Sequence, residues 1–287
     1  MNHSIQSDQL IATISDNGAE LISLVSKKTQ KEYIWQADPQ FWNKHAPILF
    51  PIVGRLKDGK YTYQGKEYEL PIHGFASSSL FTTKGACGDS ITFTLESSAE
   101  TLAVYPFEFV FNVIFKLIGN SLETIYQVEN KTDGCMYFSC GSHEGYSVSS
   151  FEDCYLEFDK DATYKSAYVS EAGLLLESDF EVIKNDRHLP LNYEFFKKND
   201  CLVFIDVPSK KVTLGSKNND TKIIVDYENT PNLVVWTREG APYLCIEPWD
   251  GLPDYEISKG DFSEKPGMIR LDKGANYSLQ HKITFEE

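Results

Sequence analysis

The sequence predicts an all-β fold, and three observations support this prediction. Short runs rich in β-branched and aromatic residues recur along the whole chain, with turn residues between them. Sustained helical periodicity is missing, which disfavours a sheet of parallel strands joined by helices. No repeat, low-complexity tract or Pro/Gly/Ser linker divides the 287 residues, a length that one β-sandwich or barrel commonly reaches. We therefore expect residues 1–287 to form a single domain.

Three pairs of strand-like runs are predicted to be hairpins, because a short turn sequence separates the members of each pair. They are 10–14 with 21–25, 61–63 with 67–70, and 107–117 with 122–128. Further strands are expected at 91–95, 136–140, 155–158, 202–205, 212–214, 222–227, 233–237, 243–247 and 277–285.

Helical and irregular segments are expected to be few. Single helical turns are predicted at 38–42 and 193–196. The stretches 38–60 and 160–200 are predicted to be loops that lie over one sheet face, where they would line a cleft.

The charge balance argues against polyanionic partners. The 27 Lys and Arg residues face 42 Asp and Glu residues, a net charge of -15, which repels nucleic acid and anionic membrane surfaces. Only four arginines are present, so a wide basic patch cannot form, although one local anion site could. A neutral small molecule is the expected ligand.

Targeting and covalent features point to a cytoplasmic protein. The first ten residues do not resemble a signal peptide, and no apolar stretch is long enough to span a bilayer. The six cysteines contain no C-x-x-C pair, so neither a disulfide framework nor a zinc knuckle is expected. Nucleotide-binding and serine-hydrolase motifs are absent, and no two histidines have helical metal-ligand spacing. We expect no cofactor and no metal.

Three residues are candidates for acid–base chemistry. His73 and His143 each lie at a strand end next to glycine, and imidazole exchanges protons near neutral pH. On sequence alone, a structural or surface role is the more common one for such histidines. Glu247 follows the apolar run Leu244-Cys245-Ile246 and precedes Pro248-Trp249, so partial desolvation would raise its pKa and make it a stronger base. The alternative is a strand-end glutamate paired with an arginine.

Two further residues are candidates for ligand binding. Arg55 follows an apolar segment and a glycine, and it could bind a hydroxyl-rich ligand or form an ion pair. Asp206 follows the apolar run 202–205 and could instead cap a turn.

The joint pattern of these residues resembles the aldose 1-epimerase (galactose mutarotase) family, in particular its LacX-like branch. The likeness runs nearly end to end. It rests on residues 33–39, Phe41-Trp42, 46–56 with Gly59-Lys60-Tyr61, Pro71-Ile72-His73-Gly74-Phe75, His143-x-x-Tyr146, 231–236 and Ile246-Glu247-Pro248-Trp249.

The resemblance implies an antiparallel β-supersandwich with a sugar cleft on its concave face. It implies that Glu247 is the catalytic base, His143 the general acid and His73 a second histidine that supports the ring oxygen. By the same resemblance, Arg55 and Asp206 bind substrate. Relatives usually have proline after the acid histidine, whereas this chain has Glu144. Glu144 could raise the pKa of His143 or compete for a sugar hydroxyl.

The implied activity is interconversion of the α and β anomers of an aldose, which needs one base, one acid and no cofactor. Trp249, Trp42 or Phe75 could stack on the sugar. A free neutral aldose is favoured, because the resemblance places only Arg55 at the cleft, and the chain is expected to be a monomer or homodimer. Two alternatives stay open: a noncatalytic carbohydrate-binding protein, and a glycosidase, which needs two carboxylates.

Overall fold

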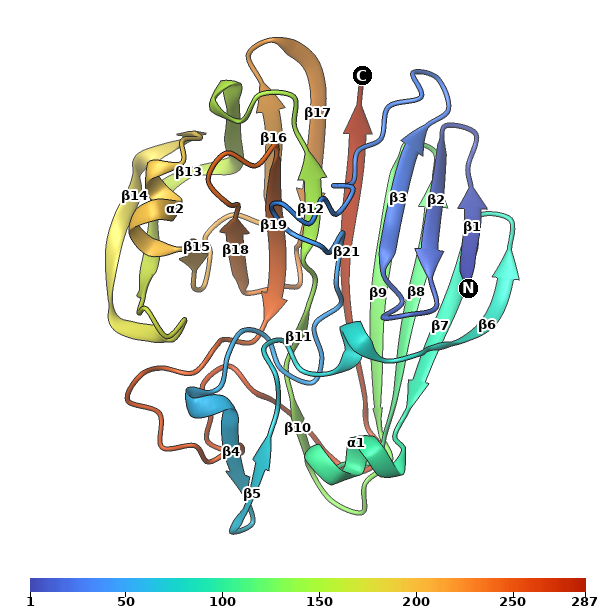
Figure 1. The fold of residues 1–287 in the computed structure, drawn as a ribbon, viewed down its shortest axis with the longest axis vertical. Coiled ribbons are helices and arrows are strands. Elements are labelled where there is room, and N and C mark those ends of the chain that lie inside the picture. The colour runs from blue at the N-terminus through green and yellow to red at the C-terminus, as the bar shows by residue number, and fades with distance from the viewer.

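The computed structural model describes residues 1–85 and 87–287, and its main feature is one large antiparallel sheet of 14 strands (Figure 1). In spatial order its strands are β11 (Cys140–Gly141), β19 (Tyr243–Asp250), β18 (Asn232–Trp236), β15 (Cys201–Phe204), β13 (Cys154–Val169), β16 (Lys211–Ser216), β17 (Asn219–Asp226), β21 (Asn276–Glu286), β9 (Ser121–Asn130), β8 (Phe109–Ile118), β7 (Ser90–Glu96) and β6 (Thr82–Cys87). In addition, β12 (Glu144–Ser147) pairs with β19, and β14 (Leu175–Pro190) pairs with β13.

Three smaller sheets complete the β structure. The first has three strands, β1 (Asn2–Gln6), β2 (Leu10–Ser15) and β3 (Leu21–Ser26). The other two have two strands each: β4 (Lys60–Tyr63) pairs with β5 (Lys66–Glu69), and β10 (Met136–Phe138) pairs with β20 (Ile269–Leu271). The helices are short: α1 (Ala99–Val104), α2 (Glu194–Asn199) and 3-10 turns at Lys57–Gly59, Ala76–Ser78 and Phe151–Asp153. In the part of the chain that the structure describes, none of the helices is long and apolar enough to cross a membrane.

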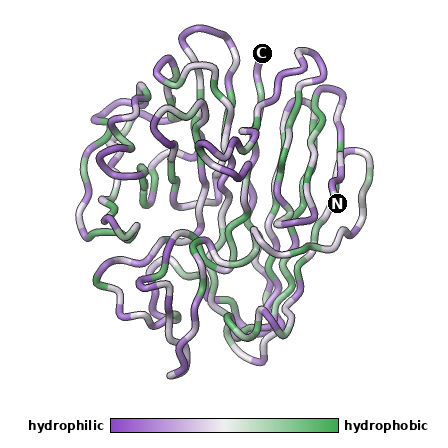
Figure 2. The backbone as a smooth tube through the Cα atoms, in the orientation of Figure 1, coloured by the Kyte–Doolittle hydropathy of each residue, from purple (hydrophilic) through white to green (hydrophobic). Residues whose placement is uncertain are grey.

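One part of the core lies between the β1–β3 sheet and the part of the large sheet that contains β7 to β9 (Figure 1), and the core also includes buried residues of β13, β16, β17 and β21. Burial alternates along β8, so that Phe111 and Val113 point into the core while Asn112 and Ile114 are only partly buried. The ring of Phe50 stacks on that of Phe111 with centroids 4.5 Å apart. Figure 2 shows hydrophobic residues along these strands and hydrophilic residues at most of the turns between them. The predicted all-β antiparallel fold is confirmed.

The three predicted hairpins are present as β2–β3, β4–β5 and β8–β9. The helical turn predicted at 193–196 corresponds to α2. Residues 38–42 form a single turn that does not continue as a helix, in which the N–H groups of Phe41 and Trp42 both donate to the carbonyl of Asp38, as in one helical turn. Helix α1 gave no periodic signal because it has six residues; the Ser98–Thr101 capping box fixes where it starts.

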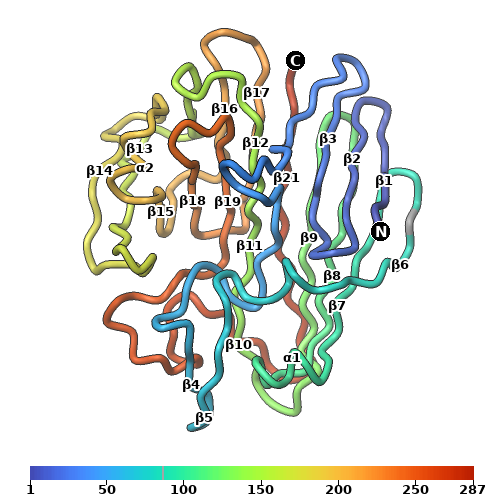
Figure 3. Tube along the Cα trace, in the orientation of Figure 1, coloured from blue at the N-terminus to red at the C-terminus, as the bar shows by residue number. Residues whose placement is uncertain are grey.

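The prediction of a loop over 160–200 is wrong, because β13 and β14 form a long two-stranded ribbon there (Figure 3). Most of β14 is exposed, so its sequence lacks the apolar–polar alternation that reveals a half-buried strand. Register shifts interrupt the ribbon at four places, which also disturbs any alternation. Backbone pairing, rather than burial, therefore organises this segment.

Candidate active site

Strand β19 places Glu247 in the interior of the protein, because this strand is paired on both sides and is buried over nearly its whole length. Gly141 lies opposite Trp249, and Glu144 lies opposite Ile246. The same antiparallel register, continued between these pairs, sets His143 opposite Glu247. Their side chains meet, with Nε2 of His143 3.4 Å from Oε2 of Glu247. The structure thus joins two of the predicted catalytic residues, which are 104 positions apart in the sequence.

Glu247 is a buried carboxyl group without a fixed partner. Its exposed fraction is 1 %, and neither of its carboxyl oxygens has a hydrogen-bond partner among the described residues. Burial, and after it the charge of Glu144, raises the pKa of Glu247 well above its usual range. A carboxyl group with these properties is a stronger base than an exposed glutamate, and its oxygens are available to a ligand.

His143 is held between aromatic side chains. Its ring stacks on Trp42 with centroids 4.9 Å apart and meets Trp236 edge-on at 5.7 Å. The indole N–H of Trp249 donates to the carbonyl of Ser142 at 3.1 Å, which fixes the backbone next to His143. Burial, and after it the neighbouring His73, lowers the pKa of His143 well below its usual value. The ring is therefore fixed in orientation and gives up a proton readily.

His73 is the third predicted catalytic residue, and the structure brings it to the same place, with its ring centroid 5.4 Å from that of His143. The N–H of Gly54 donates to Nδ1 of His73 at 3.1 Å. Burial, followed by the charge of Arg55, lowers the pKa of His73 to about 3. A neutral imidazole that accepts at Nδ1 carries its proton on Nε2. His73 therefore has an N–H group to offer a ligand oxygen.

Gly74 allows the turn that presents His73. His73 has φ +65°, and Gly74 has φ +73°. A Cβ atom on Gly74 would lie 2.4 Å from the carbonyl oxygen of Phe50, so no other residue fits here without a shift. The N–H groups of Phe75 and Ala76 donate to that same carbonyl. Position 74 beside His73 therefore requires glycine.

The three residues lie at the wall of a cavity of about 460 Å³. Its lining includes residues from the segment that follows β3, which crosses in front of β12 and β19 (Figure 3), and residues from the β13–β14 ribbon, β18 and β19. Hydrogen bonds from Trp35 N–H to the Gly145 carbonyl and from Gly145 N–H to the His45 carbonyl hold the crossing segment in place. The polar and tryptophan side chains of the lining include Trp42, Lys44, Arg55, His73, His143, Asp200, Trp236, Arg238, Glu247 and Trp249.

Of the two predicted substrate-binding residues, the structure places Arg55 in this lining and Asp206 outside it. Asp206 is exposed in the turn after β15, with φ +47°, and its N–H donates to the side chain of Asn232. This is the turn role that its sequence position also allowed. The second carboxylate in the lining belongs to Asp200, directly before β15, and nothing in its own sequence context indicated this.

Two of the three aromatic residues that were candidates for stacking, Trp42 and Trp249, line the cavity. Phe75 instead packs in the core against Phe50 and Phe109. Trp236 also lines the cavity. The sequence had indicated it only as part of the segment 231–236, one of those that carry the family resemblance.

Glu144 does not face the cavity. Successive strand residues point to opposite faces, so Glu144 points away from His143 into the layer behind β19. There its Oε1 lies 2.9 Å from Nε2 of His281, and both side chains are buried. Glu144 is therefore not placed to compete for a sugar hydroxyl in the cavity. Its charge acts from behind the sheet and favours the protonated form of Glu247.

One group of potential metal ligands lies at the same place. Ligand atoms of His143, Cys245 and Glu247 are all within 4.8 Å of one another. Burial raises the pKa of the Cys245 thiol well above its usual value, so the free side chain is a neutral thiol. Cys245 packs as a small apolar residue beside Trp35 and Tyr243.

The antiparallel β architecture, together with a buried carboxyl–imidazole pair at a cavity, defines the class of galactose mutarotase-like proteins. The model of the aldose 1-epimerase family matches residues 1–284. The chain therefore belongs to the aldose 1-epimerase family, a family of isomerases that act on sugars, as its sequence motifs indicated.

Three relatives illustrate the similarity. Protein LacX (plasmid) of Lactococcus lactis subsp. lactis is 32% identical, over 94% of this chain and 95% of its own. The structure of a galactose mutarotase related enzyme from Lactobacillus acidophilus is 34% identical, with a TM-score of 0.95 over 100% of this chain and 98% of its own. A galactose mutarotase-like protein from Lactobacillus casei is 30% identical, with a TM-score of 0.95 over 100% of both chains.

Proposed function

We propose that the protein interconverts the α and β anomers of an aldose, with Glu247 as the base and His143 as the acid. Membership of the aldose 1-epimerase family supports a mutarotase-like function. The observation that carries the assignment of residues is the 3.4 Å approach of His143 to Glu247 at the cavity wall, with both carboxyl oxygens of Glu247 unpartnered among the described residues.

In the ring-opening step, ionised Glu247 removes the proton from the O1 hydroxyl while protonated His143 delivers a proton to the ring oxygen O5. The C1–O5 bond breaks and C1 becomes an aldehyde. Rotation about the C1–C2 bond then presents the other face of the carbonyl to the O5 hydroxyl. Ring closure returns the O5 proton to His143 and the proton held by Glu247 to O1. An acid or a base placed in this way typically contributes about 10²–10⁴-fold to the rate.

Burial favours the protonation state that His143 and Glu247 have after the sugar ring has opened. Before ring opening, the pair is ionised, with the proton on His143. After ring opening, Glu247 is protonated and His143 is neutral, which is the state that the raised pKa of Glu247 and the lowered pKa of His143 both favour. The pair holds one proton throughout. The buried setting therefore stabilises the open-chain complex, where the barrier to rotation must be crossed.

His73 and Arg55 have supporting roles in this proposal. The Nε2–H group of neutral His73 donates to a sugar oxygen near His143 and keeps its proton, because its low pKa prevents a second protonation. Arg55 orients sugar hydroxyls from the cavity lining. Trp42 and Trp249 provide apolar surface for the sugar ring.

The test is polarimetry of freshly dissolved α-galactose and α-glucose, with the spontaneous rate subtracted. We expect Glu247→Gln and His143→Asn each to lower kcat by about 10²–10⁴-fold. The matched control is Glu286→Gln, because Glu286 is an exposed glutamate at the end of β21. A wild-type rate equal to the spontaneous rate for every aldose tested, including the sugars named in the next subsection, would contradict catalysis and favour a carbohydrate-binding protein.

The glycosidase alternative is tested separately. Asp200 and Glu247 are two carboxylates in the same lining, which is the minimum that glycoside hydrolysis requires. We expect no release of nitrophenol from a nitrophenyl galactoside or glucoside. Release that is lost in Glu247→Gln would replace the mutarotase assignment.

A further inference from the structure

Three basic side chains line the cavity, namely those of Lys44, Arg55 and Arg238. Among the described residues, none of the three has a carboxylate within ion-pair distance, although acidic residues outnumber basic residues 42 to 27 in the chain. This local excess of positive charge is opposite in sign to the net charge of the protein.

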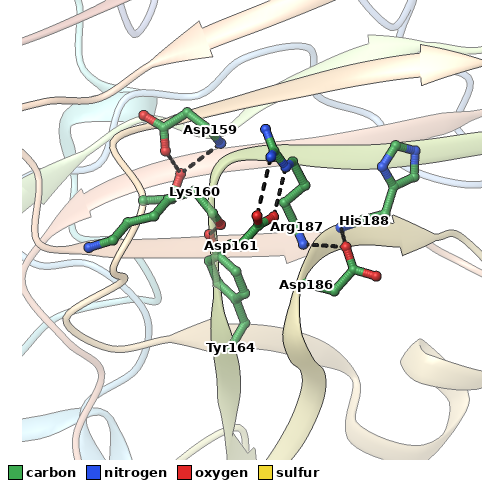
Figure 4. Close-up of polar contacts among 8 residues, drawn as sticks. Asp159, Lys160, Asp161, Tyr164, Asp186, Arg187 and His188 are labelled. Carbon is green, nitrogen blue, oxygen red and sulfur yellow. Dashed lines mark hydrogen bonds and ion pairs between the residues drawn. The ribbon is translucent and has the colours of Figure 1, made fainter.

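The other two arginines are different. Arg187 lies on the β13–β14 ribbon, and its Nε and Nη2 donate to Asp161 at 2.8 and 3.2 Å (Figure 4). Nη2 of Arg270, on β20, lies 2.8 Å from Asp272. Both arginines outside the cavity are thus neutralised locally, whereas both arginines in the cavity are available to a ligand.

Lys44 and Arg238 share the same sequence offset from the two tryptophans that contact His143. Lys44 follows Trp42 by two residues, and Arg238 follows Trp236 by two residues. These are the two tryptophans whose rings contact the ring of His143, at 4.9 and 5.7 Å. The guanidinium carbon of Arg238 is 5.8 Å from the Trp236 ring centroid. Two cations therefore accompany the aromatic residues that hold the proposed acid.

The covalent structure of the sugar indicates that C6 is the carbon whose substituent Lys44 and Arg238 would bind. In the proposed mechanism, His143 delivers its proton to O5. C5 is bonded to O5 and carries C6, so C6 is two bonds, and the first atom of a substituent on C6 three bonds, from the oxygen that His143 contacts. Trp42 and Trp236 contact His143 through their rings, and Lys44 and Arg238, each two residues further along the chain, line the same cavity.

From this arrangement we propose that the preferred substrate is a hexose 6-phosphate, with Lys44 and Arg238 binding the phosphate. This inference rests on the proposed function, because it uses the contact between His143 and O5. A phosphate monoester carries a charge of about -1.5 to -2 at neutral pH and three acceptor oxygens. An ammonium and a guanidinium group match that charge, and the guanidinium can bind two of the oxygens at once.

The carboxylates near these cations are engaged elsewhere. Glu20 lies close enough to Lys44 to feel its charge, but its Oε1 accepts hydrogen bonds from the N–H groups of His45 and Ala46. The charge of Asp200 raises the pKa of Glu247, so it acts on the side of the cavity where O1 would bind. Neither carboxylate is placed to occupy Lys44 and Arg238 in the way that Asp161 occupies Arg187.

The test measures the exchange between anomers at equilibrium by two-dimensional NMR, with galactose, glucose, their 6-phosphates and galacturonate. With wild-type protein and each sugar well below saturation, we expect the 6-phosphates to exchange at least about tenfold faster than the free hexoses. Inorganic phosphate is expected to inhibit competitively. Equal or faster exchange of the free hexoses would overturn the phosphate proposal and leave the mutarotase function intact. Exchange of no sugar would overturn both.

The double variant Lys44→Gln/Arg238→Gln tests whether these two residues bind the phosphate. Its loss of exchange with a 6-phosphate is expected to exceed its loss with the free hexose by about 10–100-fold, and Arg238→Lys is expected to keep part of the preference. The matched control is Arg270→Gln, outside the cavity, for which the ratio should not change. Equal losses on both substrates would overturn the assignment of Lys44 and Arg238. A preference for galacturonate over the 6-phosphates would overturn phosphate in favour of a C6 carboxylate.

Discussion

Glu247 and His143 act as one titrating unit, because their reacting atoms lie 3.4 Å apart and burial changes both of their pKa values. Burial disfavours the charged form of each group. In the proposed mechanism the pair carries one proton, so removing it abolishes the acid, and adding a second proton abolishes the base. The pH range of activity is therefore set by the two ionisations of the pair rather than by either residue alone.

We predict a bell-shaped dependence of kcat/KM on pH. The lowered pKa of His143 opposes a second proton on the pair, so the acid limb should lie below the ordinary histidine value of about 6.5. The raised pKa of Glu247 retains the last proton, so the alkaline limb should lie well above the ordinary glutamate value of about 4.3. Profiles of the wild type and of His143→Asn, corrected for buffer catalysis, provide the measurement. Unchanged limbs in the variant would show that other groups set the profile.

At the scale of elements, the short turn that carries His73 illustrates how backbone conformation places a functional side chain. Its hydrogen bonds to Gly54, in both directions between the two residues, orient the imidazole. The close approach of Gly74 to Phe50 then determines where the turn lies. A side chain at position 74 would disturb both the turn and the histidine.

We predict that Gly74→Ala lowers the free energy of unfolding by about 1–3 kcal/mol and lowers kcat/KM by up to about 100-fold. The reason is the 2.4 Å contact between the added Cβ and the Phe50 carbonyl oxygen, in addition to the positive φ. Gly65→Ala is the matched control, since Gly65 has φ +77° with no atom within 4 Å of its added Cβ. It should cost about 1 kcal/mol and leave activity unchanged. Urea unfolding and polarimetry of both variants distinguish the contact from the backbone strain.

At the scale of the molecule, the core and the β13–β14 ribbon have different roles. The core between the smaller sheet and β7 to β9 contains closely packed aromatic side chains, such as Phe50 on Phe111. Strand β14 of the ribbon is largely exposed, and the ribbon contributes Val169, Gly173 and Leu175 to the cavity lining. Stability should therefore depend on the core far more than on the ribbon.

We predict that Phe111→Ala lowers the free energy of unfolding by about 3–5 kcal/mol, because it removes a fully buried ring and leaves a cavity. The matched change on the ribbon is Phe180→Ala, since Phe180 is only partly buried beside Tyr168. It should cost about 1 kcal/mol or less. Urea unfolding of both variants compares the two regions. A similar loss from both would mean that the ribbon is part of the stabilising core.

The sequence by itself determined the all-β antiparallel fold, the three hairpins and the family, because apolar alternation, turn residues and local motifs are written in neighbouring positions. It also indicated His73, His143, Glu247 and Arg55, each of which lines the cavity. Only the tertiary structure placed His143 opposite Glu247, turned Glu144 to the other face of the sheet and excluded Asp206 from the lining. It alone brought Lys44 and Arg238 to the same cavity. Strand register and loop crossing decide these contacts, and both depend on pairings between segments far apart in the chain.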